Sequence, residues 1–167
     1  MVIAVNDPNP QVDGQGTALL RGSGIETRVG VLAGEAEELN RAFFTSMRSN
    51  RPHVLLKGAM TLDGKIADLH QASRWITSPE ARGLAHVLRS QSDAILVGVR
   101  TVLADDPELT VRLDPPWPRE PLRVILDSRA STPRGARVLS SGSPERTIVM
   151  TGPEAPRERV EALGRTG

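Results

Sequence analysis

The fold of this chain is decided by a continuous apolar run, Ala94-Ile95-Leu96-Val97-Gly98-Val99. Residues 122–127 and 147–150 repeat the same type of run further along the chain. Uninterrupted apolar runs of this length are typical of strands that are covered on both faces of a sheet. We therefore predict three buried strands in the second half of the molecule.

The stretch before the first of these runs predicts a helix over residues 77–89. Thr77 and Glu80 have the spacing of a capping box, and Pro79 falls in the first turn. A further helix is predicted over residues 156–163. Strands and helices that alternate in this order favour βαβ units, so we predict an α/β fold with a mainly parallel sheet and flanking helices.

The first fifty residues are expected to form a smaller unit. Short apolar stretches predict strands over residues 2–5 and 25–31, and a short helix is predicted over residues 15–21. Apolar residues at helical spacing predict one continuous helix over residues 34–48. In the polar stretch 49–52, apolar residues recur with neither helical nor strand spacing, and we place a domain boundary there.

Composition argues against several classes of function. The chain has 167 residues, a net charge of +1 and only two Phe and two Trp, so a basic or aromatic surface for nucleic acid is not expected. It has no cysteine, which excludes disulfides, thiolate zinc sites and thiol nucleophiles. No apolar run approaches the about 18 residues of a membrane span. We expect a cytoplasmic protein that handles a small molecule, without nucleic-acid or membrane partners.

Polar segments follow three of the predicted strands. Residues 61–65 follow a predicted strand over residues 54–60, residues 98–106 follow the next strand, and residues 127–129 follow the third. In open α/β sheets, ligands bind beyond the carboxyl ends of the strands. We therefore expect the three segments to meet at one cleft.

Single residues in and near these segments allow two interpretations each. Lys57 is either an edge-strand lysine whose amino group lies in solvent or a buried cation that meets a phosphate or a carbonyl. Trp75 fits either core packing or a cofactor contact. Arg89 and Arg112 are either solvated or a pair that converges on a phosphate, which suits the bidentate geometry of guanidinium.

Metal binding has no support in the sequence. His53, His70 and His86 lack the spacing of metal ligands, and cysteine is absent. Asp105 and Asp106 look like a carboxylate pair, yet the side chains of adjacent residues point apart. We therefore predict no metal site in this chain.

Taken together, these segments resemble one enzyme family. The matching motifs are Leu56-Lys57-x-Ala59-Met60-Thr61-Leu62-Asp63-Gly64-Lys65, Ser73-x-Trp75-Ile76-Thr77-Ser78 and Thr101-Val102-Leu103-Ala104-Asp105-Asp106-Pro107-x-Leu109-Thr110-Val111-Arg112. They are similar to the reductase domain of the bifunctional riboflavin-biosynthesis deaminase–reductase. Residues 1–50 resemble the tail of that family's deaminase domain, through Asp7-Pro8-Asn9-Pro10 and Leu39-Asn40-Arg41-Ala42-Phe43-Phe44.

The resemblance implies a dihydrofolate-reductase-like fold and an NADPH-dependent reduction of 5-amino-6-(5-phosphoribosylamino)uracil to the ribitylamino product. Lys57 is then expected near the sugar that is reduced, where a cation or proton donor assists hydride delivery. The family's motifs place the cofactor against Ala59, Trp75, Thr101, Asp105 and Ser128. They place the substrate against Ser73, Arg89, Leu109 and Arg112.

Two departures from the family pattern limit the activities that we expect of this chain. The deaminase needs a His-x-Glu and a Pro-Cys-x-x-Cys to hold zinc, and neither is present, so zinc binding and deamination are not expected from this chain. The family's later glycine-rich cofactor segment has no counterpart either. We therefore expect residues 1–50 to be the end of the deaminase domain and residues 51–167 to be the N-terminal part of an incomplete reductase domain. The full-length protein is expected to be a homo-oligomer.

Two alternatives stay open at this level. One is a related folate- or pteridine-type reductase, which would share the sheet but not the phosphate-bearing substrate. The other is a non-catalytic remnant that binds a nucleotide or a partner protein. Replacement of Arg89 or Arg112 by alanine tests the first alternative, and NADPH binding tests the second.

Overall fold

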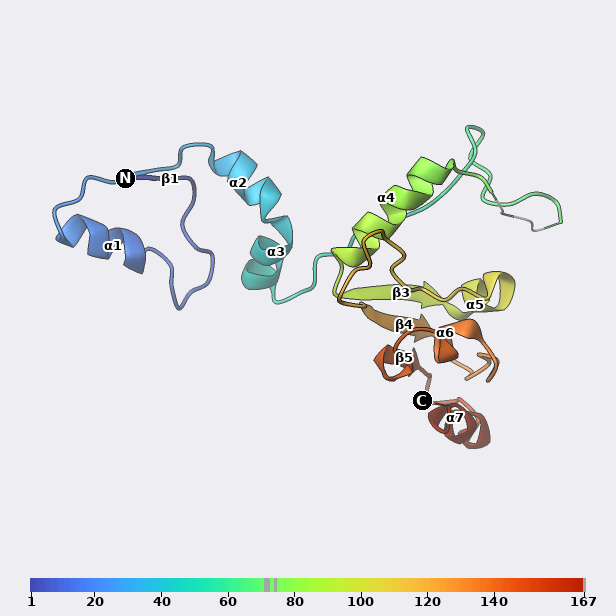
Figure 1. Ribbon diagram of the computed structural model, residues 1–167. Coiled ribbons are helices and arrows are strands. Elements are labelled where there is room, and N and C mark those ends of the chain that lie inside the picture. Colours follow the sequence, from blue (N-terminus) through green and yellow to red (C-terminus); the bar gives the residue numbers. More distant parts are fainter. Residues whose placement is uncertain (71–72, 74, 167) are drawn as a thin grey trace. The chain divides into compact units, whose positions relative to one another are not determined.

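The computed structural model describes residues 1–70, 73 and 75–166, and the chain forms two compact units, Met1–Gly58 and Ala59–Gly167. Figure 1 shows the helices and strands of each unit. Arg74, within the motif around Trp75, lies outside the described residues.

The first unit contains short elements. Strands β1 (Val2–Ile3) and β2 (Arg28–Val29) pair in parallel, and helix α1 (Gln15–Gly22) lies between them in the sequence. Helices α2 (Ala33–Leu39) and α3 (Arg41–Ser49) follow. The two predicted strands and the short helix are confirmed, although each strand is only 2 residues long.

The predicted continuous helix over residues 34–48 is wrong, because the helix breaks at Asn40. The backbone of Asn40 has φ −107° and ψ 23°, away from helical values. Its side-chain Nδ2 donates to the carbonyl oxygen of Ala36 at 2.9 Å. Asparagine side chains that bond the local backbone compete with the helix, and the apolar spacing on either side does not reveal such a break.

The second unit is built on a parallel sheet in the order β3 (Ala94–Gly98), β4 (Leu122–Leu126) and β5 (Thr147–Met150). The strands are drawn side by side in Figure 1. The helical elements are α4 (Pro79–Ser90), α5 (Val99–Asp105), α6 (Arg137–Ser140), the 3-10 helix η1 (Pro144–Arg146) and α7 (Arg157–Gly164). The α/β class, the parallel sheet and the flanking helices are therefore confirmed.

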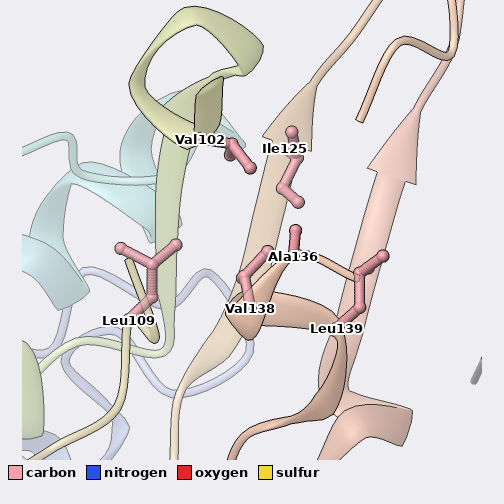
Figure 2. Close-up of a cluster of buried hydrophobic side chains, with 6 residues drawn as sticks. All are labelled: Val102, Leu109, Ile125, Ala136, Val138 and Leu139. Atoms are coloured by element: carbon pink, nitrogen blue, oxygen red, sulfur yellow. The ribbon is translucent and has the colours of Figure 1, made fainter. Parts of the chain in front are cut away.

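One face of this sheet carries the core. The buried cluster, shown in Figure 2, consists of Val102, Leu109, Ile125, Ala136, Val138 and Leu139. Ile95 and Val97 of β3 and Val149 of β5 pack against it. Ile125 and Val138 have no exposed surface. The inward side chains of all three strands thus meet one apolar layer formed by α5, α6 and the neighbouring loops.

The prediction that the strands are covered on both faces is wrong for β3 and β5. Exposure alternates along β3, where Leu96 is 59% exposed between the half-buried Ile95 and Val97. Ile148 and Met150 of β5 are exposed in the same way. Side chains of a strand alternate between the two faces of a sheet, and only one face meets the buried cluster.

Helix α4 begins one residue later than the capping box predicts. Its N-cap is Ser78, whose Oγ accepts a hydrogen bond from the Ala81 amide at 3.3 Å. A residue before proline is kept in an extended conformation, and Ser78, which precedes Pro79, has φ −65° and ψ 164°. Thr77 is therefore not the N-cap, while the helix itself is confirmed.

The predicted strand over residues 54–60 is wrong. Val54, Leu55 and Leu56 are 80%, 58% and 92% exposed, and the segment has no strand assignment. A strand needs hydrogen bonds from a neighbouring strand. Among the described residues, no strand pairs with this segment.

The turn that follows this segment is confirmed. Gly64 has φ +78°, the left-handed conformation that a glycine adopts without strain. The Lys65 amide donates to Thr61 Oγ1 at 2.9 Å, and the Thr61 hydroxyl donates to the Asp63 carboxylate. The Asp-Gly pair therefore forms the predicted tight turn.

Candidate active site

The carboxyl ends of the three strands lie in one row, because Gly98 pairs with Leu126 and Leu126 pairs with Met150. The predicted polar segment after β3, residues 98–106, forms the helix α5 directly after Gly98. Thr101 and Asp105 lie four residues apart on α5, and both are half-buried. Residues at this spacing share one face of a helix, so these two predicted cofactor residues project from the same side of α5.

Ser128 follows β4 and lies against the chain that leaves β5. The Gly152 amide donates to the carbonyl oxygen of Ser128 at 3.2 Å. A Cβ atom at position 152 would lie 3.0 Å from that oxygen, so glycine permits this close approach. The Ser128 side chain stays exposed. The segments after β4 and β5 therefore meet at the carboxyl end of the sheet, where β3 also leads into α5.

Asp127 fixes the turn that presents Ser128. Asp127 is 1% exposed, and its carboxylate accepts from the Ser131 hydroxyl at 2.9 Å and from the Thr132 amide and hydroxyl at 2.7 and 2.8 Å. Burial raises the pKa of Asp127, but these hydrogen bonds outweigh burial and hold the pKa below its ordinary value of 3.8. The turn is therefore built around an ionised carboxylate.

The two predicted phosphate-binding arginines converge on Thr110. Arg89 Nη1 donates to the Thr110 carbonyl oxygen at 2.5 Å, and Arg112 Nη1 lies 3.4 Å from the Thr110 hydroxyl oxygen. Burial lowers the pKa of Arg89, and the positive charge of Arg112 lowers it further. Two guanidinium groups in one place are suited to bind a phosphate.

Leu109 shapes the loop that carries Arg112. It is 6% exposed and belongs to the core cluster. Its backbone has φ +57°, a left-handed conformation that costs a residue with a Cβ atom about 1–2 kcal/mol. Core packing holds Leu109 in this conformation. The Leu109 side chain is buried in the core, so the predicted substrate contact of Leu109 would have to come from its backbone.

His86 and Glu120, which the sequence did not single out for the site, also hold this loop. His86 Nδ1 accepts from the Arg112 amide at 3.1 Å. Both carboxylate oxygens of Glu120 accept from the Val111 amide, at 3.2 and 3.0 Å. With the bond from Arg89, three successive loop residues are held through their backbones. The sequence did contain one signal for His86. It precedes Arg89 by three residues, and residues at this spacing share one face of a helix.

Glu108 pairs with two arginines at the rim of this loop. It accepts from Arg112 at 2.8 Å and also from Arg137. Burial raises the pKa of Glu108, but the charge and the hydrogen bond of Arg137, the hydrogen bond of Thr110 and the charge of Arg112 together lower it below its ordinary value. The buried Arg123 donates to the carbonyl oxygens of Glu108 and Ser141, which ties the loop to the segment after α6.

The predicted site residues between 57 and 75 are less enclosed. Lys57 is exposed and Ala59 is half-buried, and neither lies in a strand. Lys57 is therefore not a buried cation on a strand, and its role at the sugar stays a prediction. Ser73 is half-buried. Trp75 is 70% exposed, and the guanidinium of Arg82 lies 4.3 Å from the centre of its ring.

Within residues 1–70, 73 and 75–166, no group of three or more His, Asp or Glu side chains is placed to hold a metal ion. No helix in that part of the chain has the length and apolar character to cross a membrane.

Comparison with known proteins gives consistent matches. A family model described as the RibD C-terminal domain matches residues 52–164. The riboflavin biosynthesis protein RibD of Aquifex aeolicus is 48% identical over 167 residues, which cover 100% of this chain and 46% of that protein. The chain therefore spans less than half the length of this relative.

Solved structures agree with this match. Acinetobacter baumannii RibD, form 1, has a TM-score of 0.81 and 37% identity, covering 97% of this chain and 46% of that one. The diaminohydroxyphosphoribosylaminopyrimidine deaminase/5-amino-6-(5-phosphoribosylamino)uracil reductase of Thermotoga maritima has a TM-score of 0.81 and 44% identity. It matches over 92% of this chain and 43% of that one.

Proposed function

This chain belongs to the RibD C-terminal domain family, and from this premise we propose that it carries groups of the reductase site in riboflavin biosynthesis. The proposed reaction is the NADPH-dependent reduction of 5-amino-6-(5-phosphoribosylamino)uracil to its ribitylamino product. The Thermotoga maritima relative is named for a reductase of that substrate.

The convergence of Arg89 and Arg112 on Thr110 is the observation that carries this proposal. The substrate bears a phosphate on its ribose, and guanidinium groups recognise phosphate through paired, charge-assisted hydrogen bonds. A folate- or pteridine-type substrate without this phosphate gives no reason to hold two cations together. The phosphate-bearing substrate is therefore favoured over that alternative.

The row of strand ends fits a nicotinamide cofactor. Thr101 and Asp105 on α5 and Ser128 after β4 offer hydroxyl and carboxylate groups suited to ribose and amide groups, and Gly152 keeps the neighbouring backbone free of a side chain. When bound, NADPH supplies the hydride. Thr101, Asp105 and Ser128 would orient it, and Lys57 would provide a proton or a positive charge at the reduced sugar.

We further infer that residues 1–50 belong to the deaminase part of a bifunctional protein. The family match begins at residue 52, whereas the alignment with the Aquifex aeolicus protein covers the whole chain. Residues 1–50 contain neither a His-x-Glu nor a Pro-Cys-x-x-Cys motif. No deaminase activity is therefore proposed for this chain.

The proposed function is tested by the loss of NADPH absorbance when a full-length protein that contains this chain is mixed with NADPH and the phosphoribosylaminopyrimidine. Turnover is expected, and it is expected to fall in Arg89→Ala and Arg112→Ala variants whose circular-dichroism spectra match that of the wild type. A folded full-length protein without NADPH-dependent turnover contradicts the proposal. Equal turnover of a substrate that lacks the phosphate contradicts the assigned role of the arginines.

A further inference from the structure

We propose that His86 is a positioning residue of the phosphate site, which holds the backbone of Arg112 and so sets where that guanidinium meets the substrate. The inference rests on the proposed function, because it adds a residue to the same site. His86 acts through Arg112 in this account, so it is not called a catalytic residue.

The contact joins two separate elements of the second unit. The Arg112 amide donates to His86 Nδ1 at 3.1 Å, although the two residues are 26 positions apart in the sequence. The Arg112 side chain is 59% exposed and pairs with the Glu108 carboxylate at 2.8 Å. An exposed ion pair fixes a long side chain only weakly. The backbone bond to His86 is therefore the contact that holds Arg112 against α4.

The bond requires a neutral imidazole. Nδ1 accepts a hydrogen bond only when it carries no proton, so the proton of His86 is on Nε2. Burial lowers the pKa of His86, and the charges of Arg89 and then Arg112 lower it further. A backbone hydrogen bond at Thr110 and the charge of Glu120 act in the opposite direction. Arg89 of α4 and Arg112 and Glu120 of the segment before β4 are the charged groups that face it.

Acid is expected to open this contact. Protonation would place an N–H of His86 opposite the N–H of Arg112, and the hydrogen bond would be lost. The folded pKa of His86 lies below its ordinary value of 6.5, so the contact is fully present above pH 6.5 and is lost as the pH falls through the lower folded value. A bound phosphate also gains a proton at about pH 6. Variants are therefore needed to separate the two titrations.

Two substitutions isolate the imidazole. His86→Gln keeps a side-chain acceptor but does not titrate, and His86→Phe keeps a ring but has no acceptor. The probe is ribose 5-phosphate, and its affinity is measured by isothermal titration calorimetry across the acidic range. His53→Gln makes the same chemical change at an exposed histidine and serves as the matched control.

The expected result has three parts. At neutral pH, His86→Gln binds ribose 5-phosphate nearly as well as the wild type, and His86→Phe binds about tenfold more weakly, as expected for one lost hydrogen bond. Below pH 6.5, the wild type weakens more steeply than His86→Gln. His53→Gln follows the wild type throughout.

Equal affinities of the wild type and His86→Phe overturn the proposal, and so does a His86→Gln variant with the wild-type pH profile. The amide resonance of Arg112 gives a second readout that does not need the Phe variant to fold. It is expected to titrate with His86 in the wild type and to stay fixed in His86→Gln, and an amide that does not titrate also overturns the proposal. If this amide titrates but the wild type does not bind ribose 5-phosphate, the contact between His86 and Arg112 exists but the proposed phosphate site does not. This outcome contradicts the proposed function and is distinct from the loss of the His86 contact.

Discussion

Residues 54–69 and the loop from Asp106 to Arg112 carry equally specific motifs, but the two regions differ in how firmly they are held. Leu56 and Leu62 are 92% and 111% exposed, whereas Leu109 is 6% exposed. The loop has backbone partners from four other side chains, and the first region has no paired strand among the described residues. The difference teaches that a motif identifies which functional groups are present. Hydrogen bonds from neighbouring residues decide whether those groups are fixed in position.

The largest expected effect is a matched pair of truncations in the two regions. Ile125→Ala removes a side chain with 0% exposure and is expected to lower the free energy of unfolding by about 3 kcal/mol. Ile66→Ala changes the same residue type at 72% exposure and is expected to cost less than about 0.5 kcal/mol. Urea unfolding followed by circular dichroism measures both. Equal costs would break the comparison, because they would mean that residues 54–69 are packed as firmly as the core.

The second effect concerns substrate binding. Arg112→Ala is expected to raise the KM for the phosphoribosylaminopyrimidine about tenfold to a hundredfold, because a charge-assisted contact to the phosphate is lost. Stability should hardly change, since the Arg112 side chain in the ion pair with Glu108 is 59% exposed. Lys57→Ala is the counterpart in the other region, and it is expected to lower kcat with little change in KM. A large change in KM for Lys57→Ala and none for Arg112→Ala would reverse the assignment.

The third effect is a stability change that depends on pH. Asp127→Asn is expected to cost about 2 kcal/mol at neutral pH, because the amide lacks the negative charge and one of the two acceptor oxygens of the carboxylate. The folded pKa of Asp127 lies below 3.8. Its stabilisation is therefore present above pH 3.8 and is lost as the pH falls through the folded value. Unfolding curves of variant and wild type should converge in acid. Asp63→Asn, in the exposed turn, makes the same chemical change and is expected to alter stability at neutral pH by less than about 0.5 kcal/mol. A constant difference at every pH would argue against the ionised carboxylate.

The smallest effect belongs to Glu108. Glu108→Gln weakens pairs with Arg112 and Arg137, both more than half exposed, and is expected to cost less than about 1 kcal/mol. Added salt screens such pairs, so the difference from the wild type should shrink in concentrated salt. Thermal unfolding at low and high ionic strength measures this. A large cost that salt does not reduce would show that Glu108 holds the loop as firmly as the core does.

The fold of the second unit was largely predictable because each of its strands is a short, mainly apolar run. The boundaries of β5 match the predicted residues 147–150. The wrong predictions come from interactions that the spacing of apolar residues does not reveal. Asn40 breaks a helix through its own side chain, and residues 54–60 have the composition of a strand without a neighbour to pair with. One-sided exposure of Leu96 likewise depends on what covers the sheet.

The site was predictable in part. Arg89 and Arg112 were singled out by their motifs, and the structure brings them to Thr110. His86 and Glu120 were missed because each acts on a backbone amide, and the partners are distant in sequence for His86. The left-handed backbone of Leu109 was also hidden, because leucine gives no local signal for a positive φ.

The most direct test of the central claim compares the substrate with its dephosphorylated form. The claim is that Arg89 and Arg112 form a phosphate site, so the wild type should prefer the phosphorylated substrate in kcat/KM. Arg112→Ala should lose at least about tenfold of that preference. A variant that keeps the full wild-type preference would contradict the account.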